Sequence, residues 1–380
     1  MNVLIGVTGS IAIYKTCELI RLFIKRGDNV RVVMTKAASK FITPLTFETL
    51  TRHKVLIESN EDWSSNLNHI DFAKWADIYI IAPATANTLN KARIGIADNL
   101  LLQTYLATKA PTLFAPSANS NMYLHPTTQE SIKTLNCIEA DNGLLACGDV
   151  GVGKMADPQE IFLRTLREVE KEEFWHNKKV VITAGGSIEK IDDVRFLSNF
   201  STGKMGEALA KAFYIKGADV TLISSRQHDL PKEIKQIEVF SAEDYLKAIL
   251  NEQPDYLIMS AAIADFKPEY SPGKIKKEEI GENMIIKTKK NIDVLEALKN
   301  QTFKRIGFKA ERDEKNALTY AKNALKKKNL DAICLNLLTK NDFGSDENEI
   351  IFITKDKQIL LKQETKENIA LKLTDAIKHI

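Results

Sequence analysis

Cysteine is scarce in this sequence, which has four in 380 residues and no pair spaced as CxxC. A disulfide framework and a structural zinc site are therefore not expected, and a reducing cytosol is the expected compartment. No apolar run approaches the roughly 20 residues that a membrane-spanning helix needs. The first residues, MNVLIGVTG, lack the basic segment that opens a secretion signal, so they are expected to form a strand.

An excess of either charge is also absent, because 53 Lys and Arg residues stand against 50 Asp and Glu residues. The net charge of +3 gives no general reason to expect nucleic acid or a membrane as a partner. The 44% hydrophobic content is enough for buried cores and excludes an intrinsically disordered chain. At about 150 residues per domain, the length predicts two or three domains.

The first part of the sequence alternates short β-rich segments with helical segments. Buried strands that alternate with helices predict a parallel sheet covered on both faces. Helices are expected at Ala12–Arg26, before Gly27, and at Asn87–Ala107. Strands are expected at Asn2–Val7, Val30–Met34, Ile78–Ala82 and Thr112–Ala115.

The same alternation starts again after the charge-rich segment Arg164–Lys179, which is interpreted as a solvated helix face. We place the domain boundary near 170–178, which gives domains at 1–170 and 171–380. The predicted fold class is α/β, with two doubly wound Rossmann-like domains. The elements expected in the second half are strands at Lys179–Thr183, Val220–Ser224 and Tyr256–Ala261, and a helix at Gly206–Gly217.

A turn that contains Gly9 and Ser10 connects the first strand to the first helix. Backbone N–H groups and a hydroxyl at a helix N-terminus suit an anion. Gly9 could equally serve only to turn the chain and Ser10 only to cap the helix. The segment is not GxGxxG, so a mononucleotide fits it better than a nicotinamide dinucleotide.

Small residues follow the strand Ile78–Ala82 and would let a flat ring approach the backbone. Thr85, Asn87 and Thr88 offer polar groups there, at the edge of the sheet where α/β proteins bind ligands. A helix cap at Thr85 or Asn87 is the alternative interpretation, and both could hold at once.

Three further segments in the first half carry residues of catalytic type. A single histidine, His69, is more often packed than catalytic. Asn119 belongs to the segment PSANSNM, which follows a strand and has no evident structural need for two asparagines. Cys147 lies in a glycine-rich segment, ACGDVGVGKM, which favours a mobile loop that carries a weak acid over a site.

The second half has its own candidate sites for anions. The segment Ser201–Lys204 precedes a helix and suggests an anion-binding nest, although it is not a Walker A loop. Asp265 follows the strand Tyr256–Ala261. The lysine-rich segments Lys274–Lys277 and Lys326–Lys328 are either solvated or part of a triphosphate site.

The first half resembles the homo-oligomeric flavin-containing cysteine decarboxylases, among them the phosphopantothenoylcysteine decarboxylases of coenzyme A biosynthesis. The resemblance covers nearly all of residues 1–158 and implies a flavodoxin-like domain that binds FMN. The strings that carry it are TGSIAIYK, MTKAA, FITPLTFETL, NHIDFAKWADIYIIAPATANTLNK, PSANSNMY and ACGDVGVGKM. The FMN-binding residues that it implies are Gly9, Ser10, Ile11, Thr35, Thr85 and Asn87.

The same resemblance implies catalysis by His69, Asn119, Met122 and Cys147. FMN would oxidise the cysteinyl thiol of the substrate and return a hydride after CO2 has left, so that the cycle is redox-neutral. Cys147 would donate a proton to the new carbon centre, Asn119 would bind the substrate carboxylate, and His69 would orient the substrate.

The second half resembles the phosphopantothenate–cysteine ligases over roughly residues 178–340, through VRFLSNFSTGKMG, SAAIADF, GKIKK, GFKAE and KKNLDAIC. The resemblance implies CTP as co-substrate, with Mg²⁺ or another divalent ion whose ligands it does not assign. Arg195 and Asn199 would serve an acyl-cytidylate, and Lys274 would neutralise phosphate charge. The residues implied at the nucleotide, besides Lys274, are Ser260, Ala261, Asp265, Ile292, Asp293, Val294, Leu295, Phe308 and Lys328.

Some positions depart from the ligase pattern. Ile292 stands where that family has proline, Ala324 replaces a nucleotide-contacting lysine, and Leu337 replaces an aspartate. Lys309 or Lys322 could supply the charge that Ala324 lacks, and the preference for the base stays open.

Together the resemblances imply a bifunctional enzyme that uses 4′-phosphopantothenate, L-cysteine and CTP and forms 4′-phosphopantetheine. They also imply decarboxylase sites formed between the subunits of a trimer and ligase domains paired as dimers, hence a dodecamer. Two alternatives are a flavin-binding regulatory protein without turnover and a nicotinamide-dependent dehydrogenase. The absence of GxGxxG disfavours the dehydrogenase, and the joint presence of His69, Asn119 and Cys147 disfavours the regulatory protein.

Overall fold

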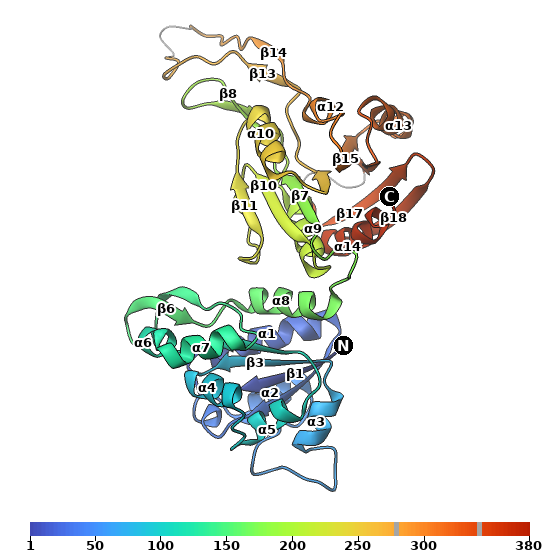
Figure 1. Cartoon of the computed structure of the whole chain (residues 1–380). Helices are drawn as coiled ribbons and strands as arrows, with labels where there is room; N and C mark the ends of the chain where they lie inside the picture. Colours follow the sequence, from blue (N-terminus) through green and yellow to red (C-terminus); the bar gives the residue numbers. More distant parts are fainter. Residues whose placement is uncertain (277–280, 340–343) are drawn as a thin grey trace. The chain divides into compact units, whose positions relative to one another are not determined.

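The computed structural model describes residues 1–276, 281–339 and 344–380. Lys277, the last residue of the predicted lysine-rich segment, lies outside the described residues. The chain divides into two compact units, Met1–Val169 and Glu170–Ile380, which are coloured blue to green and green to red (Figure 1). Among the described residues, no helix is both long and apolar enough to cross a membrane.

Unit 1 has a four-stranded parallel sheet in the order β2-β1-β3-β4, with helices around it (Figure 1). Its elements are β1 (Asn2–Val7), α1 (Ile13–Arg26), β2 (Asn29–Met34), η1 (Ala38–Lys40), α2 (Pro44–Thr51), α3 (His69–Trp75), β3 (Ile78–Ala84), α4 (Ala86–Ile94), α5 (Leu100–Ala107), β4 (Thr112–Pro116), α6 (Ser120–Leu124), α7 (Pro126–Thr134), β5 (Asp141–Leu144), β6 (Val150–Lys154) and α8 (Pro158–Glu170).

Alternate residues of the central strand β1 enter two different cores. Val3 and Ile5 pack in one core with residues of α1, α2 and α8. Leu4 packs in the other core with residues of α3, α4 and α5. Because successive strand residues point to opposite faces, the sheet is covered on both sides, as the sequence predicts.

Two segments of unit 1 differ from their predicted form. The single helix expected at Asn87–Ala107 is two helices, because Gly95 ends α4 in the left-handed region at φ 75° and Asn99 caps α5. The glycine-rich segment around Cys147 is not a plain loop but the turn of an antiparallel hairpin between β5 and β6.

Unit 2 is built on an eight-stranded mixed sheet. Its elements are β7 (Lys179–Ala184), β8 (Ile188–Lys190), β9 (Phe196–Ser198), α9 (Lys204–Ile215), β10 (Asp219–Ser224), β11 (Lys235–Glu238), α10 (Ala242–Glu252), β12 (Tyr256–Met259), β13 (Phe266–Pro268), β14 (Thr288–Lys290), α12 (Val294–Ala297), β15 (Lys304–Glu311), α13 (Ala317–Lys327), β16 (Ala332–Leu337), β17 (Glu347–Thr354), β18 (Gln358–Thr365) and α14 (Lys366–Ile377).

The six parallel strands lie in the order β11-β10-β7-β12-β15-β16, and β17 and β18 continue the sheet as antiparallel strands. The chain therefore moves outward in one direction from β7 through β10 and in the other through β12, which is the doubly wound Rossmann order. Ligands of such sheets bind beyond the strand ends at this point of reversal. The antiparallel pair was not predicted.

The charge-rich segment before β7 also differs from its prediction. The helix α8 ends at Glu170, and the residues after it do not continue as a solvated helix face. The Trp175 side chain is fully buried, with its ring centroid 4.9 Å from that of Phe213 and 5.1 Å from that of Tyr256. Trp175 thus fixes the start of unit 2 in its own core.

Replacing this anchor is expected to destabilise unit 2 selectively. Trp175→Ala removes a fully buried side chain and should cost about 3–5 kcal/mol. Trp63→Ala, at a residue that is 66% exposed, is the matched control and should leave the unfolding midpoint nearly unchanged. Urea unfolding followed by circular dichroism measures both, and equal midpoints for the two variants would contradict the anchoring role.

Candidate functional site

In unit 1, the ends of β1, β3 and β4 are tied together at one edge of the sheet. The buried Thr8 hydroxyl donates to Pro83 O at 2.6 Å and accepts from the N–H of Thr85 at 3.1 Å. The hydroxyls of Ser10 and Ser117 lie 2.9 Å apart. The turn after β1 therefore meets the segments that follow β3 and β4.

The turn after β1 is shaped to bring a ligand close to the backbone. A Cβ atom at Gly9 would lie 2.7 Å from the Cβ of Ala37, so glycine lets this turn approach the segment after β2, where Thr35 lies. Ser10 Oγ accepts from Ala12 N at 3.2 Å, and α1 itself starts without a side-chain cap. The N-terminus of α1, where the helix dipole favours an anion, therefore lies at this edge.

The remaining predicted flavin residues lie along the same edge. Thr85 accepts from Thr88 N at 3.3 Å, so the helix-cap interpretation of Thr85 is confirmed, and its role at a flavin stays a prediction. Asn87 is exposed on the first turn of α4. Ile11 is 58% exposed despite its apolar side chain, which leaves an apolar surface beside the polar turn.

Asn119 and Cys147 come together although 28 positions separate them. The amide Nδ2 of Asn119 donates to Cys147 Sγ at 3.4 Å, and this thiol lies 3.3 Å from Asp149 Oδ2. Asn119 caps α6, which also carries the exposed side chain of Met122. The thiol and the two residues of the PSANSNM segment thus share one face of the unit.

Two hydrogen bonds to the backbone of β6 hold the hairpin that carries Cys147 against α6 and the residues before it. Ser120 Oγ donates to Val152 O at 2.8 Å, and Ala118 N donates to Gly153 O at 2.9 Å. A Cβ atom at Gly153, where φ is 125°, would lie 2.2 Å from Ala118 O. Only glycine permits this close approach, so the hairpin is docked rather than free.

The other cysteines are poor candidates for acid–base work. Burial raises the pKa of Cys137 to about 12 and raises the pKa of Cys334 as well, so both thiols stay protonated. Cys147 is the exposed thiol among the four.

His69 does not join the Asn119–Cys147 pair within the same chain. Its Nδ1 lies 2.6 Å from Glu61 Oε1, and its ring makes an edge contact with Trp63 at 5.4 Å. Figure 1 shows α3, which begins at His69, on the opposite side of unit 1 from the hairpin of β5 and β6 that carries Cys147. One chain therefore presents the predicted catalytic residues as two separate groups.

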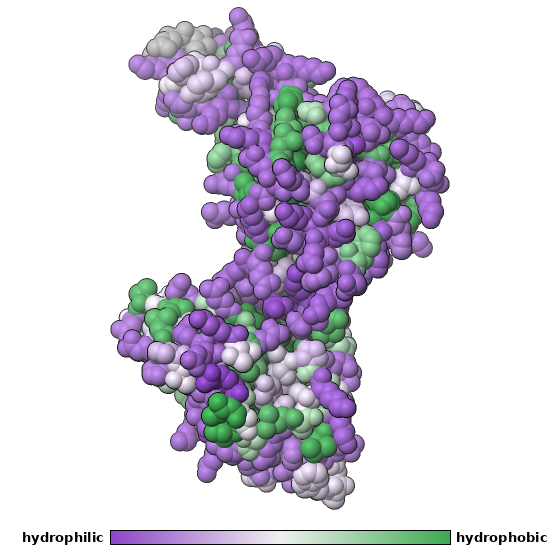
Figure 2. Space-filling view, in the orientation of Figure 1, coloured by the Kyte–Doolittle hydropathy of each residue, from purple (hydrophilic) through white to green (hydrophobic). Residues whose placement is uncertain are grey.

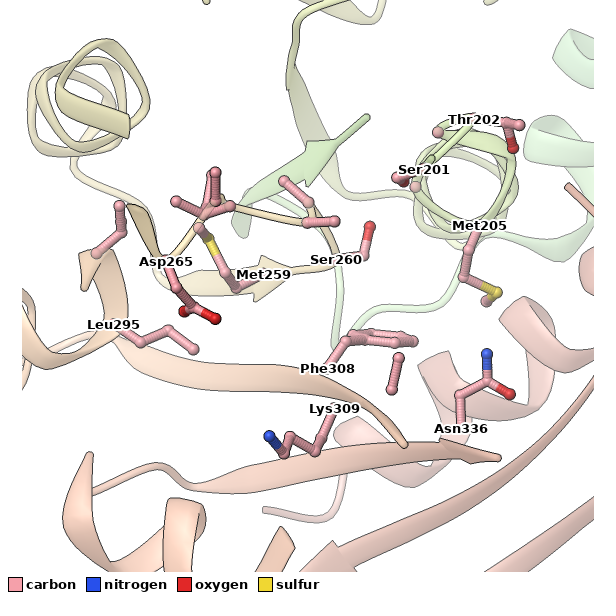
Figure 3. A pocket seen from close by; sticks show the side chains of 18 of the residues that line it. Ser201, Thr202, Met205, Met259, Ser260, Asp265, Leu295, Phe308, Lys309 and Asn336 are labelled. Atoms are coloured by element: carbon pink, nitrogen blue, oxygen red, sulfur yellow. The ribbon is translucent and has the colours of Figure 1, made fainter. Parts of the chain in front are cut away.

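Unit 2 contains a cavity of about 600 Å³ near the ends of β7 and β12, the two strands between which the strand order reverses (Figure 3). The end of β12 is tied to β7, because Ser260 Oγ donates to Thr183 O at 2.6 Å and Ala261 N donates to Thr183 Oγ1 at 3.1 Å. The predicted nucleotide residues that line the cavity are Ser260, Ala261, Asp265, Ile292, Asp293, Val294, Leu295, Phe308 and Lys328.

Charges of both signs face this cavity. Figure 3 shows the Asp265 carboxylate directed into it from the segment after β12, and the ring of Phe308 extending into it from β15. Lys328 Nζ lies 2.8 Å from Asp293 Oδ2. Burial would raise the pKa of Asp293, but the hydrogen bonds from Lys328 and from Glu296 N outweigh it and lower that pKa. Asp293 is therefore a carboxylate at neutral pH.

The opposite end of the cavity contains residues that sequence reasoning missed or only partly found. Gly203 begins α9 in the left-handed region at φ 80°, and the anion nest predicted at Ser201–Lys204 lines this end. Lys366 is 8% exposed, and burial together with Lys204 lowers its pKa. Nothing local in the sequence signals Lys366, because it lies more than 160 positions from the nest.

Two amides at this end have unsatisfied oxygens. The Oδ1 atoms of Asn336 and Asn348 are buried and have no hydrogen-bond partner in the described part of the chain. Figure 3 shows Asn336 pointing from β16 toward Met205 on α9. Buried amide groups without partners are costly, so a polar ligand is expected here.

Three predicted catalytic residues do not line the cavity. Asn199 is exposed, and its Nδ2 donates at 3.0 Å to the carbonyl oxygen of Ala262, which lines the cavity. Arg195 Nη2 donates to Ile275 O at 3.2 Å, which places the guanidinium beside the segment of Lys274. The exposed Lys274 has no described contact with the cavity residues.

Asp192 and Asp193 connect Arg195 to the Lys274 segment. Asp192 is 1% exposed and accepts from Arg195 Nη1 at 2.9 Å and from Ile275 N at 3.2 Å. Asp193 Oδ2 accepts from Gly273 N at 2.9 Å, and Gly273 O accepts from Asp193 N at 3.1 Å. Both neighbours of Lys274 in the chain are thus held by the same acidic pair.

The departures from the ligase pattern have simple positions. Lys309 lines the cavity and forms an ion pair with Glu311 at 2.9 Å. Ala324 and Leu337 pack against the unit 2 core, and Lys322 is exposed on α13 outside the cavity lining. Among the described residues, no cluster of three or more His, Cys, Asp or Glu could hold a metal ion.

Two families match the chain. The Flavoprotein family matches residues 1–170, and the family described as DNA/pantothenate metabolism flavoprotein C-terminal domain matches residues 175–380. The curated relatives include the coenzyme A biosynthesis bifunctional protein CoaBC of Bacillus subtilis, 42% identical over 93% of this chain and 91% of the relative. The Haemophilus influenzae protein of the same name is 39% identical, over 99% and 96%.

Solved structures also match each unit. One is the C-terminal domain of a CoaBC protein, 31% identical, with a TM-score of 0.47 over 55% of this chain and 97% of that one. Another is a PPC decarboxylase complexed with pantothenoylaminoethenethiol, 31% identical, with a TM-score of 0.40 over 44% of this chain and 96% of that one.

Asp192 is expected to determine how well the Lys274 segment is held. Burial raises the pKa of Asp192, but hydrogen bonds from the N–H groups of Val194, Arg195 and Ile275 outweigh it and lower that pKa. The stabilisation is therefore present above the pKa of an unfolded aspartate and is lost as pH falls through the lower, folded pKa.

Asp192→Asn should increase hydrogen exchange in a peptide covering residues 270–276 by about tenfold at neutral pH, because an amide replaces an ionised acceptor. Exchange of this peptide in the wild type should also increase on acidification. Asp229→Asn, at an exposed position, is the control. Unchanged exchange in Asp192→Asn would show that the acidic pair does not hold the segment.

Proposed function

Because the chain belongs to the family of coenzyme A biosynthesis bifunctional proteins, we propose that its two units catalyse consecutive reactions of that biosynthesis. Residues 171–380 join L-cysteine to 4′-phosphopantothenate with CTP. Residues 1–170 decarboxylate the resulting 4′-phospho-N-pantothenoylcysteine to 4′-phosphopantetheine. The contact of Asn119 with Cys147 is the single observation that supports the second reaction most strongly.

The unit 1 edge fits FMN. The uncapped start of α1 and the Ser10 and Ser117 hydroxyls suit its phosphate, and the exposed Ile11 offers an apolar surface to its ring. FMN supplies the two-electron chemistry at the cysteinyl carbon, which lets CO2 leave with no net oxidation. Thr35, Thr85 and Asn87 complete the proposed set around Gly9.

The residues of the Cys147 hairpin have separate roles in this proposal. The Asn119 amide donates a hydrogen bond to the substrate carboxylate and holds it beside the thiol. Cys147 then gives a proton to the carbon from which CO2 has left. The hairpin covers the site and keeps water from it, with Met122 as an apolar contact.

His69 is the residue that orients the substrate, and we place it across a subunit boundary. Because α3 and the β6 hairpin lie on opposite sides of unit 1, a neighbouring copy has to supply His69 to the site of Asn119 and Cys147. Head-to-tail contacts of this kind can close into a ring, and a ring of three copies agrees with the trimer that the family resemblance implies. Paired ligase units would then join trimers into a dodecamer.

In unit 2, we propose that the cavity binds CTP with Mg²⁺ bound mainly by the phosphates. The base and ribose lie by Asp265, Phe308 and the segment Ile292–Leu295, and the phosphates extend toward the start of α9. The carboxylate of phosphopantothenate attacks the α-phosphate and releases pyrophosphate. The amine of cysteine then displaces CMP from the acyl-cytidylate.

The three residues outside the cavity lining act from its border. Asn199 and Arg195 bind the acyl intermediate. Lys274, held beside Arg195 by the acidic pair, neutralises charge on the phosphates as substrates bind.

Cys147→Ser is expected to separate the two reactions. A hydroxyl is a far weaker acid than a thiol, so phosphopantetheine formation should fall by roughly 10²–10⁴-fold, while flavin absorbance and CTP-dependent CMP release stay unchanged. Cys17→Ser, at a half-buried thiol away from the hairpin, is the control. Normal decarboxylation by Cys147→Ser would overturn the assignment of the acid.

The shared site can be tested by complementation. His69→Ala and Cys147→Ser should each be inactive as decarboxylases when purified alone. Co-expressed in one cell, they should regain part of the activity, because some boundaries then combine an intact His69 with an intact Cys147. Size-exclusion chromatography checks that mixed oligomers form. Mixed oligomers without any recovery would show that one chain provides both residues.

A further inference from the structure

A buried histidine that the sequence analysis did not single out lies behind the start of α9. The side chain of His228 is 3% exposed. Its Nε2 lies 2.9 Å from Ser224 Oγ, at the end of β10, and its Nδ1 lies 3.0 Å from Glu207 Oε2, in the first turn of α9. The imidazole therefore joins the strand next to β7 with the helix that begins at the cavity.

The direction of these hydrogen bonds follows from Glu207. Burial would raise the pKa of Glu207, but hydrogen bonds from His228 and from Lys211 outweigh it and lower that pKa to about 2. Glu207 is thus a carboxylate at neutral pH and only accepts, so Nδ1 of His228 carries a hydrogen. Nε2, on the other side of the ring, forms the hydrogen bond with the Ser224 hydroxyl.

The order of serine, histidine and carboxylate is that of a nucleophilic triad, but the surroundings exclude this role. Ser224 is 3% exposed and does not line the cavity. Its oxygen also accepts from Arg226 N at 3.2 Å. A nucleophile needs access to its substrate, so the arrangement must act on its neighbours instead.

The neighbour on which it acts is Gly203. A Cβ atom at Gly203 would lie 2.7 Å from Cε1 of His228 and 3.3 Å from Gly185 N. The ring therefore lies close to Gly203, which caps the N-terminus of α9 in the left-handed region. The N–H groups that follow, those of Lys204, Met205 and Gly206, belong to the first helical turn and lie at the cavity.

We propose that His228 is a positioning residue for polyphosphate binding: it fixes the Gly203 turn so that the first N–H groups of α9 point at the phosphates of the nucleotide. This inference rests on the proposed function of unit 2. His228 itself touches no substrate, and its effect passes through Gly203 and Glu207. Displacement of a binding turn by about one ångström can reduce kcat/KM by roughly 10²-fold.

The test is a set of three variants of the whole chain. His228→Ala removes both hydrogen bonds and the ring, and should raise the KM for CTP by about 10- to 100-fold, with kcat and the KM for cysteine within about threefold of wild type. His228→Gln can still donate to Glu207 and accept from Ser224, and should restore most of the affinity for CTP. His176→Ala, at an exposed histidine, is the control.

The outcomes separate positioning from general stability. An unchanged KM for CTP in His228→Ala would overturn the proposal. So would equal losses in every kinetic constant together with a lowered melting temperature, or a His228→Gln variant as impaired as His228→Ala. Calorimetric binding of inorganic pyrophosphate should weaken in His228→Ala by a similar factor, and unchanged binding would also count against the role.

Failure of the proposed function has a different signature. If the wild-type chain releases no CMP from CTP with phosphopantothenate and cysteine, then unit 2 is not the proposed ligase. The pyrophosphate measurement still decides the role of His228 in that case, because it needs no turnover.

Discussion

The same interaction holds the functional edge of both units: a buried threonine hydroxyl at the end of the first strand that is bonded to the neighbouring strand end. The Thr8 hydroxyl joins Pro83 O to Thr85 N in unit 1. In unit 2 the Thr183 hydroxyl accepts from Ala261 N, and the Thr183 carbonyl beside it accepts from Ser260 Oγ. Each hydroxyl satisfies backbone groups where the parallel ladder ends. Without it, buried N–H or C=O groups would lose their partners at the place where a ligand must fit.

These bridges explain why distant segments meet at each site. In unit 1 they align the turn after β1 with the start of α4, so that Ser10, Ser117 and Thr85 share an edge. In unit 2 they align the end of β12 with the turn that leads to α9, and the cavity lies between them. The groups that we propose to be catalytic lie on less regular parts: the Cys147 hairpin in unit 1 and the Arg195–Lys274 segments in unit 2.

Much of this could be predicted from the sequence, because alternating strands and helices with strand-end turns determine where a doubly wound sheet binds ligands. The nine predicted nucleotide residues that line the unit 2 cavity came instead from the resemblance to the ligases. Lys366, Asn348 and His228 were not predicted, because their roles arise from packing between elements far apart in the chain. The resemblance implied that decarboxylase sites form between subunits, but no pattern in the residues themselves showed that His69 and Cys147 lie apart within one chain.

The central claim is that two units of one chain act consecutively on one cysteine. The most direct measurement supplies the pure protein with 4′-phosphopantothenate, CTP, Mg²⁺ and L-cysteine labelled with ¹³C in its carboxyl carbon, and follows the products by mass spectrometry. The account predicts that CMP and labelled CO2 accumulate in equal amounts with unlabelled 4′-phosphopantetheine. CMP without labelled CO2, or neither product from folded protein that contains flavin, would contradict it.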